Sequence, residues 1–305
     1  MPELPEVETV RRGLAQACLG VTCLGGEVLD RRGLASPQSE AAFLHGLRGQ
    51  TFVDWQRRGK YLLGRLAMMA STSRTGEGHE PGGWLGVHLR MTGQLLWLEA
   101  NAPLQKHTRV RLFFEGQREL RFVDQRTFGK LWWVSPDQTP EGVISGLQHL
   151  GPEPLSPQFS ASYLQERLRD RKRPIKSALL DQALVAGLGN IYTDEALFLS
   201  GLHPATPGSE LTFSQLQRLQ SAIVQVLETS LREGGTTFSD FRNLSGVNGN
   251  YGGVAWVYRR GGQPCRVCNT VILRLKLAGR SSHFCPYCQP LTSHLNPEAK
   301  NNFAI

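Results

Sequence analysis

Short runs of apolar residues, several of them alternating with polar ones, dominate the chain from Val21 to about Trp133. Glycine, aspartate and arginine interrupt these runs at intervals of about eight to twelve residues. The clearest runs are Thr51–Trp55, Tyr61–Leu66, Trp84–Leu89, Val110–Phe114 and Leu120–Val123. Many short strands at this spacing are typical of a β-sandwich or barrel. The pattern therefore predicts a first domain built from β-strands.

A helical repeat precedes these strands. Its apolar positions, three or four residues apart, are Val7, Val10, Leu14 and Cys18. Pro5 suits the first helical turn and Gly20 stands where a helix would stop. The spacing predicts a helix that begins just after Pro2 and presents one apolar face.

The second half of the chain changes to a helical period after a proline-rich connector, Leu150–Pro157. Helices are expected around residues 160–170, 174–184, 190–200 and 211–233. Thr212 or Ser214 is available to cap the last helix, and Gly234 and Gly235 follow its end. This pattern predicts a second, mainly helical domain.

Two stretches have the composition of surface loops. Ala67–Gly83 and Asn243–Gly253 are rich in Gly, Ser or Asn and lack periodic apolar residues. The residues after Pro290 are polar, and we expect this tail to be poorly ordered.

Six cysteines include two CxxC pairs, Cys265 with Cys268 and Cys285 with Cys288, separated by sixteen residues. Two such pairs at this spacing indicate a four-cysteine zinc site, and four protein ligands leave no open position, so the metal is expected to be structural. The alternatives are a redox pair or four buried thiols. A hairpin between the pairs would present Gly279–His283 on its turn, where Arg280 could grip a phosphate.

Charge points to an anionic partner. Thirty-four basic and 26 acidic side chains give a net charge of +8, which favours nucleic acid or an anionic membrane surface. The membrane is the weaker candidate, because the chain has no apolar run of about eighteen residues and its acidic N-terminus is unlike a signal peptide. A cytoplasmic protein is expected.

The N-terminus carries a candidate nucleophile. Methionine followed by proline favours removal of the initiator residue, which would leave Pro2 as a free secondary amine. Such an amine can attack an electrophilic carbon and form an iminium, and an α-amino pKa of about 7.7 to 8 leaves a useful fraction neutral. The alternative is that the Pro–Glu start only favours helix initiation.

Several other residues suit DNA contact, although each also has an ordinary structural reading. Lys60 is expected on a turn into a strand, and Arg126 and Phe128 on a loop where they could probe a base stack. In Gln182–Tyr192, a glycine-broken turn, Asn190 would cap a helix whose free N–H groups can receive a phosphate. The alternatives are a packing turn and solvated surface charges.

In combination these segments resemble formamidopyrimidine-DNA glycosylases from residue 2 to about residue 290. The matching motifs are Pro2–Thr9, Arg57–Tyr61, His88–Gly93, Leu150–Leu155, Gly187–Tyr192 and the zinc finger. The resemblance implies a bifunctional base-excision enzyme for oxidised purines such as 8-oxoguanine and formamidopyrimidines. It acts on damaged double-stranded DNA, and we expect a monomer with one structural zinc ion as its cofactor.

The resemblance also implies roles for individual residues. Pro2 would attack the sugar C1′ and form the Schiff base, and Glu3 would donate a proton. Lys60 matches the lysine of β-elimination and phosphate binding, and Arg280 the arginine of δ-elimination. The expected DNA contacts are His107, Arg126, Arg171, Lys176 and Asn190, and the residues expected to fill the gap left by the everted base are Met91, Arg126 and Phe128.

The fold class that follows is α+β, with an N-terminal β-sandwich, a helix-two-turn-helix domain and a C-terminal zinc finger. The expected boundaries are 1–135 for the catalytic sandwich with its leading helix, 136–157 for a linker, 158–250 for the helical domain, 251–290 for the finger and 291–305 for the tail.

Two alternatives remain at this stage. An endonuclease VIII-like enzyme would share the architecture and prefer oxidised pyrimidines, and a non-catalytic zinc-ribbon protein would bind DNA without cleaving it. The stretch Ala67–Gly83 is longer than expected for the family, and Asn243–Gly253 matches no motif residue by residue, so the lesion preference stays open.

Overall fold

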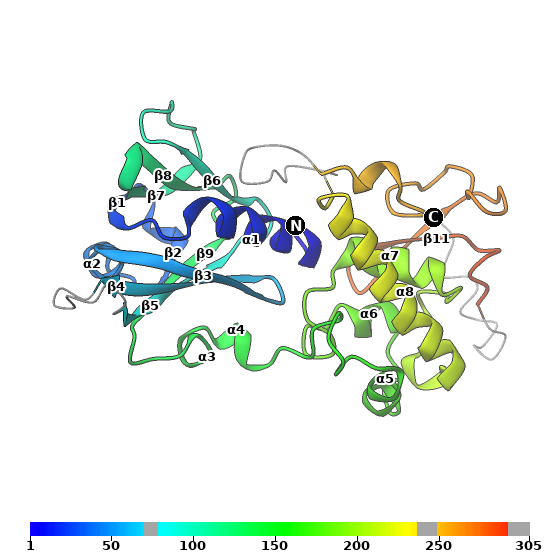
Figure 1. The fold of residues 1–305 in the computed structure, drawn as a ribbon. Coiled ribbons are helices and arrows are strands. Elements are labelled where there is room, and N and C mark those ends of the chain that lie inside the picture. Colours follow the sequence, from blue (N-terminus) through cyan, green and yellow to red (C-terminus); the bar gives the residue numbers. More distant parts are fainter. Residues whose placement is uncertain (70–78, 237–248, 292–305) are drawn as a thin grey trace. The chain divides into compact units, whose positions relative to one another are not determined.

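The computed structural model describes residues 1–69, 79–236 and 249–291, and the chain divides into two compact units (Figure 1). Unit 1 comprises Met1–His149 and Glu233–Asn250, and unit 2 comprises Leu150–Arg232 and Tyr251–Ile305. Among the described helices, none has the length and apolar character needed to cross a membrane.

Unit 1 is a sandwich of two sheets, as the strand pattern predicted. One sheet has the order β1-β7-β8-β6, with bounds Cys23–Val28, Thr108–Phe114, Arg118–Asp124 and Gly93–Glu99. The other has the order β2-β9-β5-β4-β3, with bounds Leu34–Ser36, Lys130–Val134, His79–His88, Tyr61–Met69 and Gln50–Arg58. All described strand pairs in the two sheets are antiparallel except β2 with β9.

The predicted leading helix is confirmed as α1, Leu4–Cys18. Its apolar stripe joins the sandwich core, and the members of that stripe are at most 1 % exposed: Val7, Val10, Leu14 and Cys18. Full burial of each such aliphatic side chain contributes about 1.5 to 3 kcal/mol. This packing anchors the N-terminus of the chain to the sandwich.

The first part of the predicted linker 136–157 belongs to unit 1 and contains two short helices, α3 (Pro140–Val143) and α4 (Ser145–Gln148). Ile144 and Leu147 are buried there. A Cβ atom on Gly86 would come within 2.6 Å of the Ile144 side chain. The segment is therefore packed against β5, and it is not a free connector.

Unit 1 also contains helix α2 (Glu40–Leu47), which is capped by Ser39.

The predicted surface loop Ala67–Gly83 is wrong at both ends, because β4 extends to Met69 and β5 begins at His79. Residues 70–78 lie outside the described part of the chain. The glycines that suggested a loop serve close packing instead. A Cβ on Gly83 would lie 2.2 Å from the carbonyl oxygen of Val134, and one on Gly82 would lie 2.4 Å from Oε1 of Gln50.

The four predicted helices of unit 2 are confirmed as α5 (Ala161–Leu168), α6 (Ile175–Leu179), α7 (Asn190–Leu199) and α8 (Phe213–Arg232). Helix α6 is shorter than the predicted 174–184, because the chain turns after Leu180. The backbone N–H of Gln215 donates to Oγ1 of Thr212 at 3.3 Å, so Thr212 caps α8. Gly234 and Gly235 follow its end with φ of 72° and 86°, which glycine adopts at little cost.

The finger of unit 2 consists of a hairpin, β10 (Leu273–Leu277) and β11 (Arg280–Phe284), between the two cysteine pairs. Ala278 and Gly279 form the turn, which is smaller than the predicted Gly279–His283 because Ser282 and His283 are buried in β11.

The described residues of the two units also contain short 3-10 helices, which are Arg31–Gly33, Glu115–Gln117, Gly208–Glu210 and Tyr251–Gly253.

Residues 233–250 group with unit 1 and not with the helical domain to which the sequence assigned them. The Glu6 carboxylate accepts hydrogen bonds from the backbone N–H and the hydroxyl of Thr236, at 2.8 and 3.1 Å. The predicted helical domain, 158–250, therefore extends too far, because its last part belongs to unit 1. Residues 237–248 and the tail 292–305, each covering part of a predicted loop or tail, lie outside the described residues.

Candidate active site and DNA-binding surface

The N-terminal residues form a buried group at the start of α1. Glu3 is the N-cap, and its backbone N–H donates to Oε2 of Glu6 at 2.8 Å. Pro2 lies directly ahead of this helix start, as expected, and is buried there with Met1 still in place. The Pro2 nitrogen becomes a secondary amine only when Met1 has been removed. The sequence did not assign a role to Glu6, whose carboxylate connects the backbone of Glu3 to Thr236.

Lys60 lies on the turn between β3 and β4, as expected, and is only 6 % exposed. Gly59 has φ of 56°, and its carbonyl oxygen accepts from Nη1 of Arg57 at 3.0 Å. Nε of Arg57 in turn contacts Glu8 of α1 at 3.3 Å. Burial raises the pKa of Glu8, but hydrogen bonds from Arg11 and Arg12 outweigh this effect and lower the pKa overall. The charged Glu8 thus connects the N-terminal helix to the Lys60 turn.

His88, at the end of β5, is a second residue of this region that the sequence left without a role. Burial lowers the pKa of His88 to about 3, assisted by the positive charges of Arg90 and Lys60. Nδ1 of His88 accepts a hydrogen bond from the backbone N–H of Arg90 at 3.0 Å, which requires that nitrogen to be unprotonated. The ring stands edge-on to Tyr61 at 4.5 Å between centroids. His88 is therefore neutral near physiological pH.

The three residues expected to fill a base gap lie on two loops that are hydrogen-bonded to one another. Met91 is 40 % exposed and Phe128 is 48 % exposed, so the ordinary reading of Met91 as core filler is wrong. The Arg126 guanidinium lies 4.6 Å from the centroid of the Phe128 ring. The backbone N–H of Arg126 donates to Oγ1 of Thr92 at 3.1 Å, which joins the two loops.

His107 lies half-buried immediately before β7, and its carbonyl oxygen accepts from the backbone N–H of Asp124 at 2.9 Å. The loop that precedes it is held by the fully buried Arg121. This guanidinium pairs with Glu119 and donates to the carbonyl oxygens of Ala102 and Pro103 at 3.0 and 2.8 Å. The position of His107 is thus fixed by the bond from Asp124 and by the contacts of Arg121 with the preceding loop.

Lys176 is buried in the interior of unit 2, and its expected contact with a DNA phosphate stays a prediction. Its side chain is 1 % exposed, and Nζ donates to Oδ1 of Asp194 and to the carbonyl oxygen of Ser281, both at 2.6 Å. A buried ammonium is stable only with partners of this kind. Lys176 therefore links α6 to α7 and to the finger.

Asn190 is the first residue of α7 and does not cap it, because Gly189 occupies the N-cap position. Nδ2 of Asn190 donates to the same Ser281 carbonyl oxygen at 3.1 Å. Its Oδ1 is buried without a hydrogen-bond partner among the described residues. The expectation of a capping asparagine is wrong, whereas a contact of this helix start with phosphate stays a prediction.

Asp194 is the centre of the contacts between α7 and the finger. Its Oδ2 accepts from the backbone N–H of His283 at 2.9 Å and lies 3.1 Å from Nδ1 of the same residue. With Lys176 on Oδ1, one fully buried carboxylate holds strand β11 of the hairpin against α6 and α7. Neither Asp194 nor His283 was singled out by the sequence, since a lone acid within a helix has no distinctive pattern.

We expect Asp194→Ala to destabilise the protein by about 3 to 5 kcal/mol, because it leaves the buried Lys176 ammonium without its counter-ion. Urea unfolding followed by tryptophan fluorescence measures this effect. Asp181→Ala is the matched control, since Asp181 pairs with Arg173 and Arg171 at 2.7 and 3.5 Å but is 30 % exposed. That change should cost about 1 kcal/mol or less. Equal losses in the two variants would contradict the role of Asp194.

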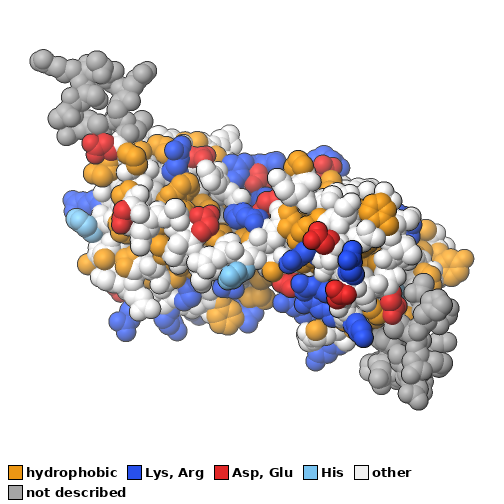
Figure 2. Space-filling model, turned by 90° about the horizontal axis from the view of Figure 1, so that it is seen from below, with side chains coloured by type: hydrophobic (Ala, Val, Ile, Leu, Met, Phe, Trp, Pro, Cys, Tyr) orange, Lys and Arg blue, Asp and Glu red, His pale blue; other side chains and the backbone are white. Residues whose placement is uncertain are grey.

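Arg171 and Arg280 remain available for the contacts assigned to them. Arg171 is half-buried near Asp181, and Arg280 is exposed at the first position of β11, next to the turn. Lys and Arg side chains are spread over the face drawn in Figure 2, interspersed with acidic ones. Both side chains are cationic and at least partly exposed, and a contact with a DNA phosphate requires these two properties.

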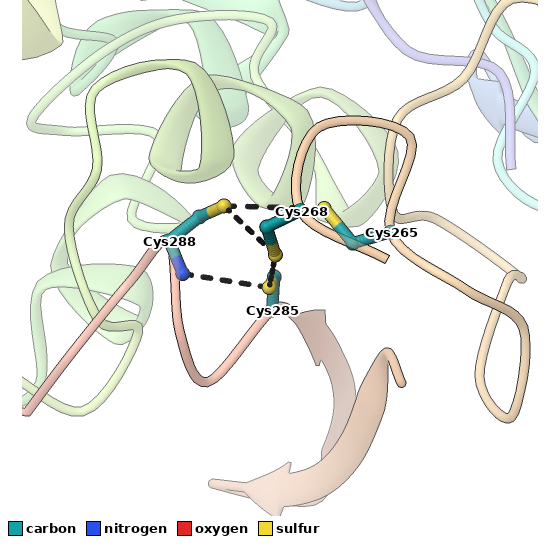
Figure 3. Close-up of side chains that lie close together, drawn as sticks. All are labelled: Cys265, Cys268, Cys285 and Cys288. Atoms are coloured by element: carbon teal, nitrogen blue, oxygen red, sulfur yellow. Dashed lines mark hydrogen bonds between the residues drawn. The ribbon is translucent and has the colours of Figure 1, made fainter. Parts of the chain in front are cut away.

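The four predicted zinc ligands converge from the two ends of the finger (Figure 3). The four sulfur atoms lie within 4.8 Å of one another, with Cys265 to Cys288 at 3.9 Å and Cys268 to Cys285 at 3.4 Å. A tetrahedral site with Zn–S bonds of about 2.3 Å requires sulfur atoms about 3.8 Å apart. The residues therefore fit one zinc ion, and four cysteine ligands leave it no position for substrate.

Comparison with protein families matches three successive segments of the chain. Residues 1–131 match the formamidopyrimidine-DNA glycosylase N-terminal domain, and residues 150–242 match the formamidopyrimidine-DNA glycosylase H2TH domain. Residues 262–291 match the zinc finger found in FPG and IleRS. Together these matches cover most of the two units.

Individual proteins are similar over nearly the whole length. The formamidopyrimidine-DNA glycosylases of Acaryochloris marina and of a Synechococcus strain are each 62 % identical over 290 residues, covering 95 % of this chain and 99 % of theirs. The structure of Lactococcus lactis FPG with a Fapy-dG-containing DNA is 33 % identical, with a TM-score of 0.82, and covers 95 % of this chain and 100 % of that one. The structure of FPG from Thermus thermophilus is 38 % identical, with a TM-score of 0.80, and covers 94 % and 98 %.

Proposed function

Because this chain belongs to the formamidopyrimidine-DNA glycosylase family, we propose that Pro2 is the nucleophile with which it performs that family's reaction. The enzyme removes oxidised purines, formamidopyrimidines and 8-oxoguanine, from damaged duplex DNA and cleaves the strand at the resulting abasic site. One structural zinc ion supports its finger. The single observation that supports Pro2 is its position directly ahead of the N-cap of α1, beside the buried Glu3.

The proposed chemistry uses the secondary amine twice. The Pro2 nitrogen attacks C1′ of the damaged nucleotide, and the bond to the base breaks as Glu3 supplies a proton. The sugar ring then opens as O4′ takes up the proton that the Pro2 nitrogen loses, and this leaves an iminium between Pro2 and C1′, which acidifies the proton on C2′. Loss of that proton expels the 3′ phosphate by β-elimination, with Lys60 holding phosphate, and a second elimination with Arg280 releases the 5′ phosphate. Water then frees Pro2.

The other assigned residues hold and open the duplex in this proposal. An enzyme that acts on a base must take it out of the stack and grip the strand by its phosphates. The residues proposed for the grip are His107, Arg171, Lys176 and Asn190, and those proposed for the gap are Met91, Arg126 and Phe128. The hydrogen-bonded arrangement of the two exposed loops supports the second assignment.

Location and assembly are part of the same proposal. The similar glycosylases come from bacteria, where chromosomal DNA lies in the cytoplasm, so we place the protein there. We also propose that it acts as a monomer. The helical domain and the finger are proposed as separate functional parts, with boundaries near 158–250 and 251–290, although residues 233–250 pack with unit 1.

Borohydride trapping on a duplex that contains 8-oxoguanine tests the assignment of Pro2. Reduction of the iminium should fix the DNA to the protein, and mass spectrometry of a proteolytic digest should find the adduct on a peptide that begins at Pro2. An adduct on Lys60 or another lysine, with no adduct on Pro2, would refute the assignment. Comparing 8-oxoguanine with thymine glycol in the same assay tests the alternative preference for oxidised pyrimidines, which predicts faster trapping on thymine glycol.

A further inference from the structure

We propose that Asp124 is a positioning residue that sets the two loops carrying Met91, Arg126 and Phe128 before DNA binds. The proposal rests on the function proposed above for these three residues. Asp124 ends β8 and is fully buried, yet it carries a carboxylate. A buried carboxylate is stable only when it accepts several hydrogen bonds. In this protein the donors come from both loops.

The carboxylate of Asp124 divides its bonds between the loops. Oδ1 accepts from the Thr92 hydroxyl at 2.5 Å and from the backbone N–H of Arg126 at 3.2 Å. Oδ2 accepts from the backbone N–H of Gly129 at 2.7 Å. Thr92 follows Met91 directly, and the Arg126 and Gly129 bonds enclose the segment that contains Phe128. One side chain therefore fixes the spacing between the Met91 loop and the Arg126–Phe128 loop.

The backbone of Asp124 connects the same point to a third segment. Its N–H donates to the carbonyl oxygen of His107 at 2.9 Å, and its carbonyl oxygen accepts from Nε of Arg109 at 2.8 Å. His107 is an expected DNA contact. Asp124 thus holds the proposed gap-filling residues in a fixed relation to a residue proposed to grip the strand.

Both loops contain a residue in the left-handed backbone region, which is unfavourable for side chains other than glycine. Arg90, just before Met91, has φ of 53°, and Thr127, between Arg126 and Phe128, has φ of 58°. For a β-branched residue such as threonine this conformation is rare. Strained residues of this kind persist only where surrounding contacts determine them, and they gather at functional sites. The bonds of Asp124 on either side of Thr127 provide such contacts.

The Asp124 contacts therefore order both loops before DNA binds. Loops that are already ordered lose little conformational entropy when they enter a duplex, so more of the contact energy is available to hold the base out of the stack. Loss of the Asp124 contacts should therefore slow the step in which the base leaves the stack. It should affect much less the cleavage of a preformed abasic site, which has no damaged base to extrude.

Thr92→Val and Asp124→Asn test the proposal. The valine keeps the shape of Thr92 but removes the hydroxyl that joins the loops, and the asparagine side chain replaces one acceptor oxygen of Asp124 by an amide donor. Each variant should slow single-turnover excision of 8-oxoguanine by about tenfold, the loss expected for one buried hydrogen bond. Cleavage of a preformed abasic site should stay within about threefold of the parent. Thr92→Ser, which keeps the hydroxyl, should restore excision.

Two further measurements separate positioning from general damage to the fold. The fluorescence of 2-aminopurine placed opposite the lesion should rise more slowly with Thr92→Val, since that signal follows filling of the gap. Thr22→Val is the matched control, because its hydroxyl bonds Thr51 at 3.0 Å in the same unit and neither residue belongs to the two loops. That variant should excise 8-oxoguanine like the parent.

Equal losses on both substrates, or unchanged excision in Thr92→Val, would overturn the role of Asp124. If Asp124→Asn does not fold, the comparison of Thr92→Val with Thr92→Ser and the 2-aminopurine signal decide the role of Asp124. Failure of the Pro2 assignment is distinguishable, because it would show in the parent enzyme as a borohydride adduct on another residue. In that case the ratio of excision to abasic-site cleavage in the Thr92 variants still decides the role of Asp124.

Discussion

Pro2→Gly should lower strand cleavage at 8-oxoguanine by about a thousandfold, which corresponds to about 4 kcal/mol of transition-state stabilisation. The variant still begins with a free amine after removal of Met1, but a primary amine forms an iminium that can lose its N–H proton and become a neutral imine. A proline iminium has no N–H proton, so it keeps the positive charge that drives elimination. Single-turnover kinetics on a lesion-bearing duplex measures the loss.

DNA affinity should change by less than about threefold in the same variant, because Pro2 lies buried at the helix start and makes no charged grip on the strand. Pro5→Ala is the matched control, since Pro5 is a second proline at the start of α1, in its first turn, but has no free nitrogen. That change should leave cleavage close to the parent rate. Parent-like turnover of Pro2→Gly would remove Pro2 from the mechanism.

Cys285→Ala should abolish specific zinc binding and weaken binding of lesion-bearing DNA by about a hundredfold. Structural zinc in small fingers contributes about 10 to 16 kcal/mol of folding free energy, so the hairpin that carries Arg280 should lose its shape. An arginine–phosphate contact is one of the stronger hydrogen-bonded pairs, and its loss together with neighbouring contacts accounts for the expected drop in affinity. Titration of a fluorescent duplex at fixed salt, together with a zinc assay, measures both effects.

Cys23→Ser is the matched control for the finger variant. Cys23 is buried in the sandwich, where its thiol donates to the carbonyl oxygen of Gly25 at 3.5 Å, and a serine hydroxyl can make the same bond. This variant should keep one zinc per chain and parent-like DNA affinity. Full affinity in a zinc-free Cys285→Ala protein would show that the finger is not needed to bind DNA.

Much of the fold could be predicted because its signals are local. The period of α1 and the alternation of strands such as β7 are set by residues a few positions apart. The four cysteines carry their own spacing rule, and the motifs at Pro2, Lys60 and Arg126 were recognisable by resemblance. Wrong expectations arose where one residue type serves two purposes. The glycines of the predicted loop 67–83 allow close packing in β5.

The sequence by itself determined the α+β class, the zinc ligands and the family, because each of these depends on short spacings or on residue chemistry, and it supplied the candidates for attack and grip on DNA. Only the tertiary structure decided which polar residues work inside the protein. Glu6, Asp124 and Asp194 each bond residues far away in the chain. A carboxylate in a sequence carries no sign of those partners, since its burial and its donors exist only after distant segments have packed together.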